Sequence, residues 1–187
     1  MNKPIDLSVV LLHDGMVDKQ KKLVTASLTL IDVHDIARSS ATYSTSAFYV
    51  AHPGPTIRKL ARTLKAHWEE GYGATYNPNR KEAIEHVRIV SSLDEAITDI
   101  DTRTGKLPKL IATSAHDGGK RLSFSGGKEL LATGEPCLLM LGTAWGMAEE
   151  LLKRADYFLE PVKGPGSYNH LSVRSACAIM LDRLVGR

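Results

Sequence analysis

The chain has few residues that could cross-link it, hold a metal or anchor it in a membrane. Only two of its 187 residues are cysteine, Cys137 and Cys177. Each lies in an apolar pattern, so we expect buried, unreactive thiols rather than a disulfide. No second histidine or cysteine lies at ligand spacing from His34, which argues against a zinc site. The apolar run Leu7–Leu12 is too short to span a membrane, and its surroundings lack a signal-peptide pattern. These absences favour a cytoplasmic protein.

The sequence also lacks the common nucleotide and hydrolase motifs. The turn Gly142–Gly146 reads GTAWG, without the G-x-G-x-x-G order of dinucleotide sites. No G-K-[ST] sequence is present, and GKEL at Gly127, the nearest approach, has no hydroxyl residue. A G-x-S-x-G nucleophile elbow is missing as well. NAD, ATP and GTP are therefore disfavoured as ligands.

What remains is an ordinary globular composition, 43% hydrophobic and 24% charged, with a net charge of +3. A length of 187 residues fits one domain covering 1–187. Such a chain buries a full core without metals or disulfides. The charge allows a nucleic-acid partner but does not require one.

Short apolar runs alternate with helical patterns, which predicts an α/β fold with a mainly parallel sheet. The predicted strands are Leu7–Leu12, Ala47–Ala51, Val87–Val90, Lys109–Thr113, Cys137–Leu141 and Tyr157–Leu159. The predicted helices are Val17–Leu28, Ile36–Thr42, Thr56–Glu70, Leu93–Thr102, Gly127–Thr133, Gly146–Arg154 and His170–Val185.

Two of these helices carry informative faces. On the helix from Thr56, apolar residues recur at helical spacing and should face the core: Ile57, Leu60, Ala61, Leu64 and Trp68. Arg58, Arg62 and Lys65 share another face, which is either a solvated surface or a stripe that binds RNA phosphates. The last helix is apolar on much of its surface, so it is central in the domain or shared with a second subunit.

Two polar segments could carry chemistry. In Asp32–Tyr43, Asp35 suits an N-cap and Arg38 follows one turn later; a capping aspartate and a surface arginine is the plainer interpretation. In HWEEGYGATYNPNR, Tyr72 and Tyr76 either stack on unpaired bases or pack a corner between a helix and a strand. For the tyrosines, packing is the favoured interpretation.

Two glycine-rich loops lie close together near the end of the sequence. The apolar run from Leu138 enters the turn at Gly142, and PVKGPGSYNHLSVR follows from Pro161. A buried strand, a glycine turn and a helix start form the usual ligand-holding arrangement of α/β proteins. We expect one pocket with two walls.

The chain resembles the SPOUT superfamily of S-adenosylmethionine-dependent RNA methyltransferases. The resemblance covers nearly the whole sequence and rests on DVHDIARSSATY, HWEEGYGATYNPNR, PKLIATSA, LLMLGTAWGMAEELL and LEPVKGPGSYNHLSVRSACAIMLDRL. The DIAR segment is similar to the N-G-A-I-x-R element of the ribose-methylating SpoU branch, with Arg38 at the functional arginine. Ala144 departs from the glycine expected in this branch.

The resemblance implies a three-layer α/β/α fold with a C-terminal trefoil knot, a homodimer and S-adenosylmethionine as cofactor. Three loops would hold the cofactor: 113–115, 141–143 with Gly146, and 161–175. The cofactor-binding residues it implies are Thr113, Ser114, Ala115, Leu141, Gly142, Thr143, Gly146, Leu159, Pro161, Asn169, His170, Leu171, Ser172 and Ser175.

The residue chemistry agrees with such a site. Gly142 lets the adenine approach the backbone, and Leu141, Leu159 and Leu171 can sandwich the ring. Arg38, as a permanent cation, would stabilise a developing alkoxide or clamp the adjacent phosphate. His34 is the better proton acceptor. Asn169, the third candidate catalytic residue, and Ser172 either cap the last helix or reach the cofactor or the substrate ribose.

The function expected is ribose 2′-O-methylation of tRNA or rRNA, with structured RNA, tRNA first, as the partner. The placement of Arg38 favours ribose, and the segment Pro161–Ser175 contains no acid that could serve as a base. Base methylation, as in the guanine-N1 branch, is the alternative within the class. A non-catalytic module that binds RNA or the cofactor is the third possibility.

Overall fold

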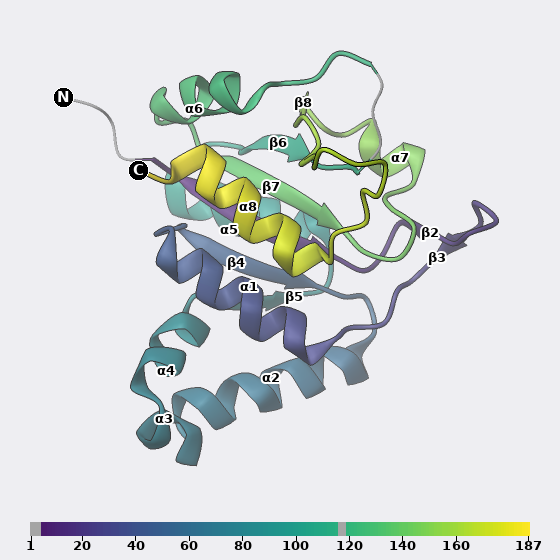
Figure 1. Cartoon of the computed structure of the whole chain (residues 1–187). Helices are drawn as coiled ribbons and strands as arrows, with labels where there is room; N and C mark the ends of the chain where they lie inside the picture. The colour runs from purple at the N-terminus through teal and green to yellow at the C-terminus, as the bar shows by residue number, and fades with distance from the viewer. Residues whose placement is uncertain (1–4, 116–118) are drawn as a thin grey trace.

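The computed structural model describes residues 5–115 and 119–187 and is built around one parallel sheet (Figure 1). The six strands lie in the order β5-β4-β1-β7-β6-β8, and every neighbouring pair is parallel. Their bounds are β1 Leu7–Leu12, β4 Ala47–Ala51, β5 Val87–Val90, β6 Lys109–Ala112, β7 Cys137–Gly142 and β8 Tyr157–Phe158. The expected α/β fold with a parallel sheet is confirmed, and the carboxyl ends of all six strands meet at one edge.

Helices cover both faces of the sheet (Figure 1). One face packs against α1 (Leu30–Thr42), α8 (Val173–Val185) and, further out, the remaining helices of that layer: α2 Pro55–Glu69, α3 Tyr72–Tyr76, α4 Pro78–Glu85 and α6 Phe124–Ala132. The other face packs against α5 (Leu93–Thr104) and the short α7 (Glu149–Leu152). No helix in 5–115 or 119–187 is long and apolar enough to cross a membrane.

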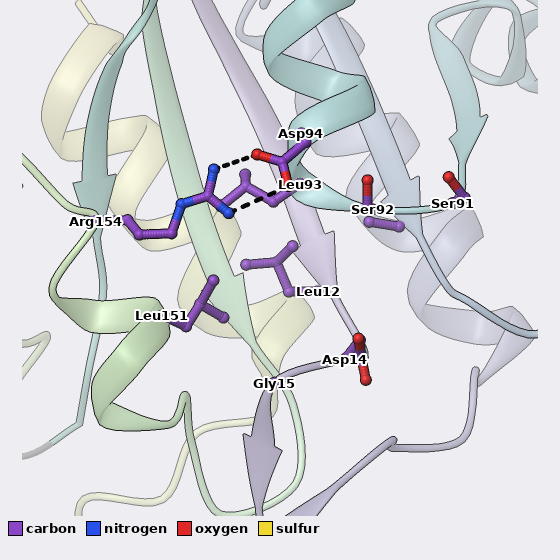
Figure 2. Close-up of a pocket in the computed structure, with 10 residues that line it drawn as sticks. Leu12, Asp14, Gly15, Ser91, Ser92, Leu93, Asp94, Leu151 and Arg154 are labelled. Carbon is purple, nitrogen blue, oxygen red and sulfur yellow. Dashed lines mark hydrogen bonds and ion pairs between the residues drawn. The ribbon is translucent and has the colours of Figure 1, made fainter.

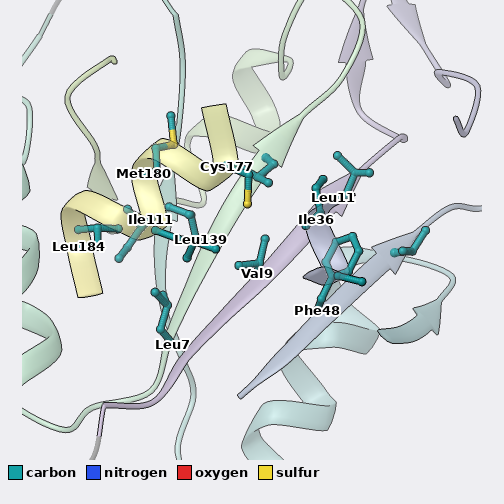
Figure 3. Close-up of a cluster of buried hydrophobic side chains, with 14 of the residues drawn as sticks. Leu7, Val9, Leu11, Ile36, Phe48, Ile111, Leu139, Cys177, Met180 and Leu184 are labelled. Carbon is teal, nitrogen blue, oxygen red and sulfur yellow. The ribbon is translucent and has the colours of Figure 1, made fainter. Parts of the chain in front are cut away.

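The central strand β1 explains why the sheet is buried on both sides. Leu7, Val9 and Leu11 point into the cluster under α1 and α8, and Val10 and Leu12 point into the opposite cluster. Figure 3 shows the first cluster, where Cys177 and Met180 of α8 lie against the strand side chains. Burying each such side chain is worth about 1.5–3 kcal/mol. A continuous apolar run is what a doubly covered parallel strand requires.

All six predicted strands are confirmed to within one residue at each end. The predicted helix Val17–Leu28 is wrong: this stretch is a hairpin of β2 (Met16–Val17) and β3 (Leu23–Val24). Its turn is held by Asp18, whose carboxylate accepts from the amides of Gln20 and Lys22, while Lys21 takes a left-handed φ of 63°. Local side-chain bonds of this kind compete with helix formation.

Several helix boundaries also differ from prediction. The first helix begins at Leu30 after Thr29, so the interpretation of Asp35 as an N-cap is wrong. The short helices α3 and α4 were not predicted, although Asn77 caps α4 and Pro78 starts it. On α2, Ala61 is buried as expected, but Leu60 is 46% exposed.

Candidate active site

The first two predicted loops are tied to the ends of neighbouring strands. The hydroxyl of Thr113, after β6, donates to the carbonyl of Met140 in β7 over 2.8 Å. The hydroxyl of Thr143, after β7, donates to the carbonyl of Leu12 in β1 over 2.9 Å. Each threonine thus satisfies a strand carbonyl at the carboxyl edge of the sheet, so both loops leave the sheet in fixed directions.

The turn after β7 has an unusual backbone. Gly146 takes a φ of 108°, a region that side chains rarely adopt, and nothing lies within 4 Å of where a Cβ would be. Ala144 is also left-handed, with a φ of 49°. The glycine expected at position 144 therefore has a conformational reason, and alanine there costs about 1–2 kcal/mol of backbone strain.

The third loop begins in the core and ends in the open. Leu159 and Pro161 are buried, whereas Tyr168 is 79% exposed. Gly164 and Gly166 have open space where a Cβ would lie. The loop is fastened to the first loop because the Asn169 amide donates to the Ala115 carbonyl over 2.8 Å. The three loops therefore border one region at the sheet edge, where a flat ligand such as adenine could approach the open backbone at Gly146, Gly164 and Gly166. The expected approach at Gly142 is wrong, because Met147 and Met16 fill the space beside that glycine.

Asn169 and Ser172 have separate roles. The hydroxyl of Ser172 accepts from the amide of Ser175 over 3.3 Å and so caps α8. Asn169 points to the first loop instead, so it does not cap this helix. The last helix accordingly begins at Val173, not at His170.

The remaining predicted cofactor residues differ in exposure. Leu141 and Leu159 are fully buried, whereas Leu171 is 47% exposed. Of the three leucines predicted to sandwich the adenine ring, only Leu171 therefore has a side chain free to contact it. Of the others, Ser114, Gly142, Thr143 and Gly146 are half-buried, and Ala115, His170 and Ser175 are exposed.

Arg174 joins the third loop to α1, a contact that the sequence analysis did not identify. Its Nη1 donates to Asp32 Oδ1 over 3.0 Å, and its Nε lies 3.3 Å from Asp35 Oδ2. Asp32 is only 8% exposed, so its carboxylate is largely removed from water, whereas the Arg174 side chain stays 34% exposed. The bridge places the helix that carries His34 and Arg38 beside the start of α8. Arg174 lies within the NHLSVR part of the third loop, but the sequence alone did not identify its partners Asp32 and Asp35.

His34 and Arg38 lie four residues apart on α1 in different surroundings. The His34 ring meets Trp68 edge-on at 5.6 Å, and its Nδ1 is buried without a partner among the described residues. Burial, and then the nearby charge of Arg80, lower the pKa of His34. Arg38 is exposed and has no hydrogen bond or ion pair within 5–115 or 119–187. A neutral imidazole and a free guanidinium suit a proton acceptor and an anion-binding group.

The predicted phosphate stripe on α2 is not a row of free cations. Arg58 Nη1 donates to the carbonyls of His52, over 2.8 Å, and of Pro53. Lys65 pairs with Glu69 and reaches the carbonyl of Ile84. Arg62 is exposed. Two of the three side chains thus have internal partners, and the stripe as an RNA site stays a prediction.

Tyr72 and Tyr76 do not pack the corner after α2, so that favoured interpretation is wrong. They are 75% and 72% exposed and stack on one another with ring centroids 5.8 Å apart. Arg80 lies over the nearby Trp68 ring at 4.6 Å. An exposed aromatic pair of this kind can receive an unpaired base.

A separate cavity of about 140 Å³ opens beyond the carboxyl ends of β1 and β4 (Figure 2). Figure 2 shows Asp14, Ser91 and Ser92 around it, with the ion pair between Arg154 and Asp94 at one side. It lies on the α5 and α7 side, and none of the predicted cofactor residues lines it. Ligand sites usually measure about 300–1,000 Å³, so it is too small for S-adenosylmethionine.

The described residues show no group of three His, Cys, Asp or Glu side chains that could hold a metal ion.

Comparison with known proteins identifies the family. A family model described as "SAM-dependent RNA methyltransferase" matches residues 6–186. A relative from Oleidesulfovibrio alaskensis named "tRNA (guanine-N(1)-)-methyltransferase" is 42% identical over 97% of this chain, and the match covers 42% of that protein. A relative from Aquifex aeolicus whose name gives no function is 36% identical over 96% of this chain and 88% of its own length.

Solved structures share the fold. The SpoU methyltransferase AviRb from Streptomyces viridochromogenes gives a TM-score of 0.61 at 18% identity, over 97% of this chain and 60% of that one. A probable methyltransferase from Bordetella pertussis gives 0.64 at 13% identity, over 96% and 94%. The SPOUT resemblance and the expectation of S-adenosylmethionine as cofactor are confirmed. With the family model spanning nearly the whole sequence, the chain belongs to the S-adenosylmethionine-dependent RNA methyltransferases.

Proposed function

We propose that the chain methylates tRNA, with N1 of guanine as the first candidate acceptor. The observation that carries the proposal is the junction of the three loops at the sheet edge, where Asn169 joins loop 161–175 to loop 113–115 and Arg174 joins it to α1. The names of two relatives, 42% and 41% identical, support guanine N1 over the ribose acceptor favoured by the sequence analysis. The chain spans about two fifths of each of these relatives, so their names describe considerably longer proteins.

Ribose 2′-O-methylation is the second candidate, because Arg38 is exposed and free to bind an anion. The absence of acidic residues from Pro161 to Ser175 supports it too. A cation stabilises a developing alkoxide, whereas deprotonation of guanine N1 calls for a base. Guanine N1 and the ribose hydroxyl both lose a proton during methyl transfer, so either reaction needs a proton acceptor, the role proposed for His34.

The mechanism divides between cofactor and protein. S-adenosylmethionine supplies the activated methyl group. Arg38 holds the substrate phosphate or the charge that develops on the acceptor atom, and His34, kept neutral by its surroundings, receives the proton. Asn169 acts as a positioning residue, because its amide fixes the third loop against the first. In the turn after β7, the open backbone at Gly146 would hold the adenine.

The knot and the dimer belong to the same proposal. The bond from Asn169 to Ala115, followed by the packing of α8 between α1 and α6, supports a trefoil knot in which α8 passes the loop after β6. Val173, Ala176 and Ile179 on α8 pack against the core but keep part of their apolar surface exposed, which supports a homodimer built on this helix. Light scattering should then give twice the 20.4 kDa of the chain.

The deciding experiment is methyl transfer from labelled S-adenosylmethionine into total tRNA and rRNA from a strain that lacks the gene, followed by nucleoside mass spectrometry. Labelled 1-methylguanosine in tRNA supports the first candidate, and a 2′-O-methylated nucleoside supports the second. Cofactor binding without transfer to any RNA would favour the non-catalytic module.

A further inference from the structure

The hairpin of β2 and β3 carries three exposed lysines at its turn. Lys19, Lys21 and Lys22 have no ion pair with any residue in 5–115 or 119–187. The adjacent Asp18 does not neutralise them by contact, because its Oδ1 accepts from the backbone amides of Gln20 and Lys22 at 2.8 and 2.9 Å. The turn therefore presents three cations on a folded support.

This hairpin is bonded to the glycine turn of the cofactor site. The amide of Val17 donates to the carbonyl of Gly146 over 2.9 Å, and the amide of Trp145 donates to the carbonyl of Val17 over 3.1 Å. Met16 pairs with Met147 in an antiparallel bridge. Residues 145–147 thus lie alongside β2, held by these bonds and one isolated bridge. Figure 1 shows the hairpin projecting at the end of the molecule toward which β7 points.

Trp145 adds an aromatic surface beside β2, where its amide is bonded to Val17. It belongs to the glycine turn, and 57% of its surface is exposed. Exposed tryptophans and lysines together favour nucleic acid, since bases stack on aromatic rings while ammonium groups neutralise phosphates.

We propose that the hairpin is an RNA-binding arm, with Lys19, Lys21 and Lys22 on the phosphate backbone and Trp145 against an unpaired base. The arm rests on the proposed function in one respect, namely that the substrate is RNA. Because β2 is bonded to residues 145–147, an RNA strand bound by the arm would lie next to the glycine turn of the cofactor site. Substrate recognition in this chain would then come from the same turn that would hold the adenine.

The test compares two variants that each lose three positive charges. Lys19→Gln/Lys21→Gly/Lys22→Gln neutralises the arm and keeps the left-handed turn at position 21. Lys106→Gln/Lys109→Gln/Lys128→Gln removes equal charge near the opposite edge of the sheet and on α6. Affinity for total tRNA is measured by fluorescence anisotropy from 50 to 200 mM salt, and cofactor affinity by calorimetry.

The arm variant should lose about tenfold or more in tRNA affinity at 50 mM salt. The slope of log affinity against log salt should become shallower by about 0.7–0.9 for each phosphate contact removed. The control should change less than twofold, and both should bind S-adenosylmethionine as the parent does. Trp145→Ala should weaken binding to single-stranded RNA, with Trp145→Phe restoring most of it. Equal losses in arm and control, or an unchanged slope in the arm variant, would overturn the proposal.

Methyl transfer by the parent chain, assayed in parallel, separates this proposal from the proposed function. If the parent binds tRNA through the arm but transfers no methyl group, the proposal of the arm stands and the proposed activity is wrong. If the parent methylates RNA while the arm variant binds tRNA normally, the proposed activity stands and the proposal of the arm is wrong.

Discussion

At the scale of single residues, Arg38 and His34 lie one helix turn apart in different surroundings, as their different proposed roles require. Arg38 is exposed and free of partners among the described residues, whereas the His34 ring lies against Trp68. A side chain without internal contacts adds little to stability, so its replacement can test the proposed role in the reaction without disturbing the fold.

Replacing Arg38 by alanine should reduce kcat by ~100- to 1,000-fold, the usual effect of removing one group that stabilises a developing anion. Cofactor affinity and melting temperature should stay within error of the parent. Single-turnover methyl transfer, calorimetry and thermal denaturation measure the three quantities. A parent-like turnover would remove Arg38 from the reaction.

The surroundings of His34 predict an acid limb in the rate profile. Burial and the charge of Arg80 lower its pKa below the ordinary 6.5, so the ring is neutral at pH 7 and activity should fall only at a lower pH, as the ring protonates. Loss of a neighbouring cation favours the protonated ring and raises that pKa. Arg80→Gln should therefore move the acid limb of kcat to higher pH, and Arg80→Lys should leave it in place. If the acid limb lies at the same pH in the parent, Arg80→Gln and Arg80→Lys, His34 is not the proton acceptor.

At the scale of secondary structure, the bridge from α8 to α1 depends on Arg174. Its replacement by glutamine leaves the carboxylate of Asp32, which is 8% exposed, without its cation. The free energy of unfolding should fall by roughly 1–3 kcal/mol, as measured by urea denaturation.

A double-mutant cycle with Asp32→Asn controls for unrelated effects of the Arg174 replacement. The two changes should be non-additive by at least ~0.5 kcal/mol, because the residues contact each other. Additive losses would mean that the bridge does not stabilise the helix pair.

Strands were easier to predict than helices in this chain for a physical reason. β1 and β7 are buried on both faces, so their apolar runs are continuous and end sharply at polar or glycine residues. The segment from Val17 to Leu28 has good helix formers, yet the Asp18 carboxylate and the left-handed Lys21 turn it into a hairpin. That outcome depends on pairing with residues 145–147, which are distant in sequence.

At the scale of the whole molecule, the two thiols report on the integrity of the cluster under α1 and α8, in which both are buried. Burial raises the pKa of Cys137 and of Cys177 to about 12, and the thiolate is the reactive form. The folded chain at pH 8 should therefore react with a thiol reagent far more slowly than the urea-unfolded chain, which should titrate two thiols. Rapid native-state labelling would show that one of these sites opens without global unfolding.

The candidate site was predictable in its parts but not in its connections. Thr113, Gly142 and Asn169 were expected from the resemblance, and their loops do meet at one edge. Arg174, Trp68 and Arg80 were missed because their significance comes from partners on other helices: Asp32 for the first and His34 for the other two. A single sequence gives residue types and spacing, whereas long-range ion pairs and shifts in pKa arise only from tertiary packing.

The strand order also has a consequence for the synthesis of the chain. β1 is made first, yet one of its two partners, β7, is made late: Leu7 pairs with Cys137. At typical ribosomal rates the interval is on the order of ten seconds, during which a strand with six buried residues has an open, apolar edge. β4 and β5 can pair with β1 early, so half of the sheet can form before the strands of the other half have been synthesised. Nascent chains stalled before Cys137 should therefore engage chaperones strongly, and those extended beyond Val185 should release them.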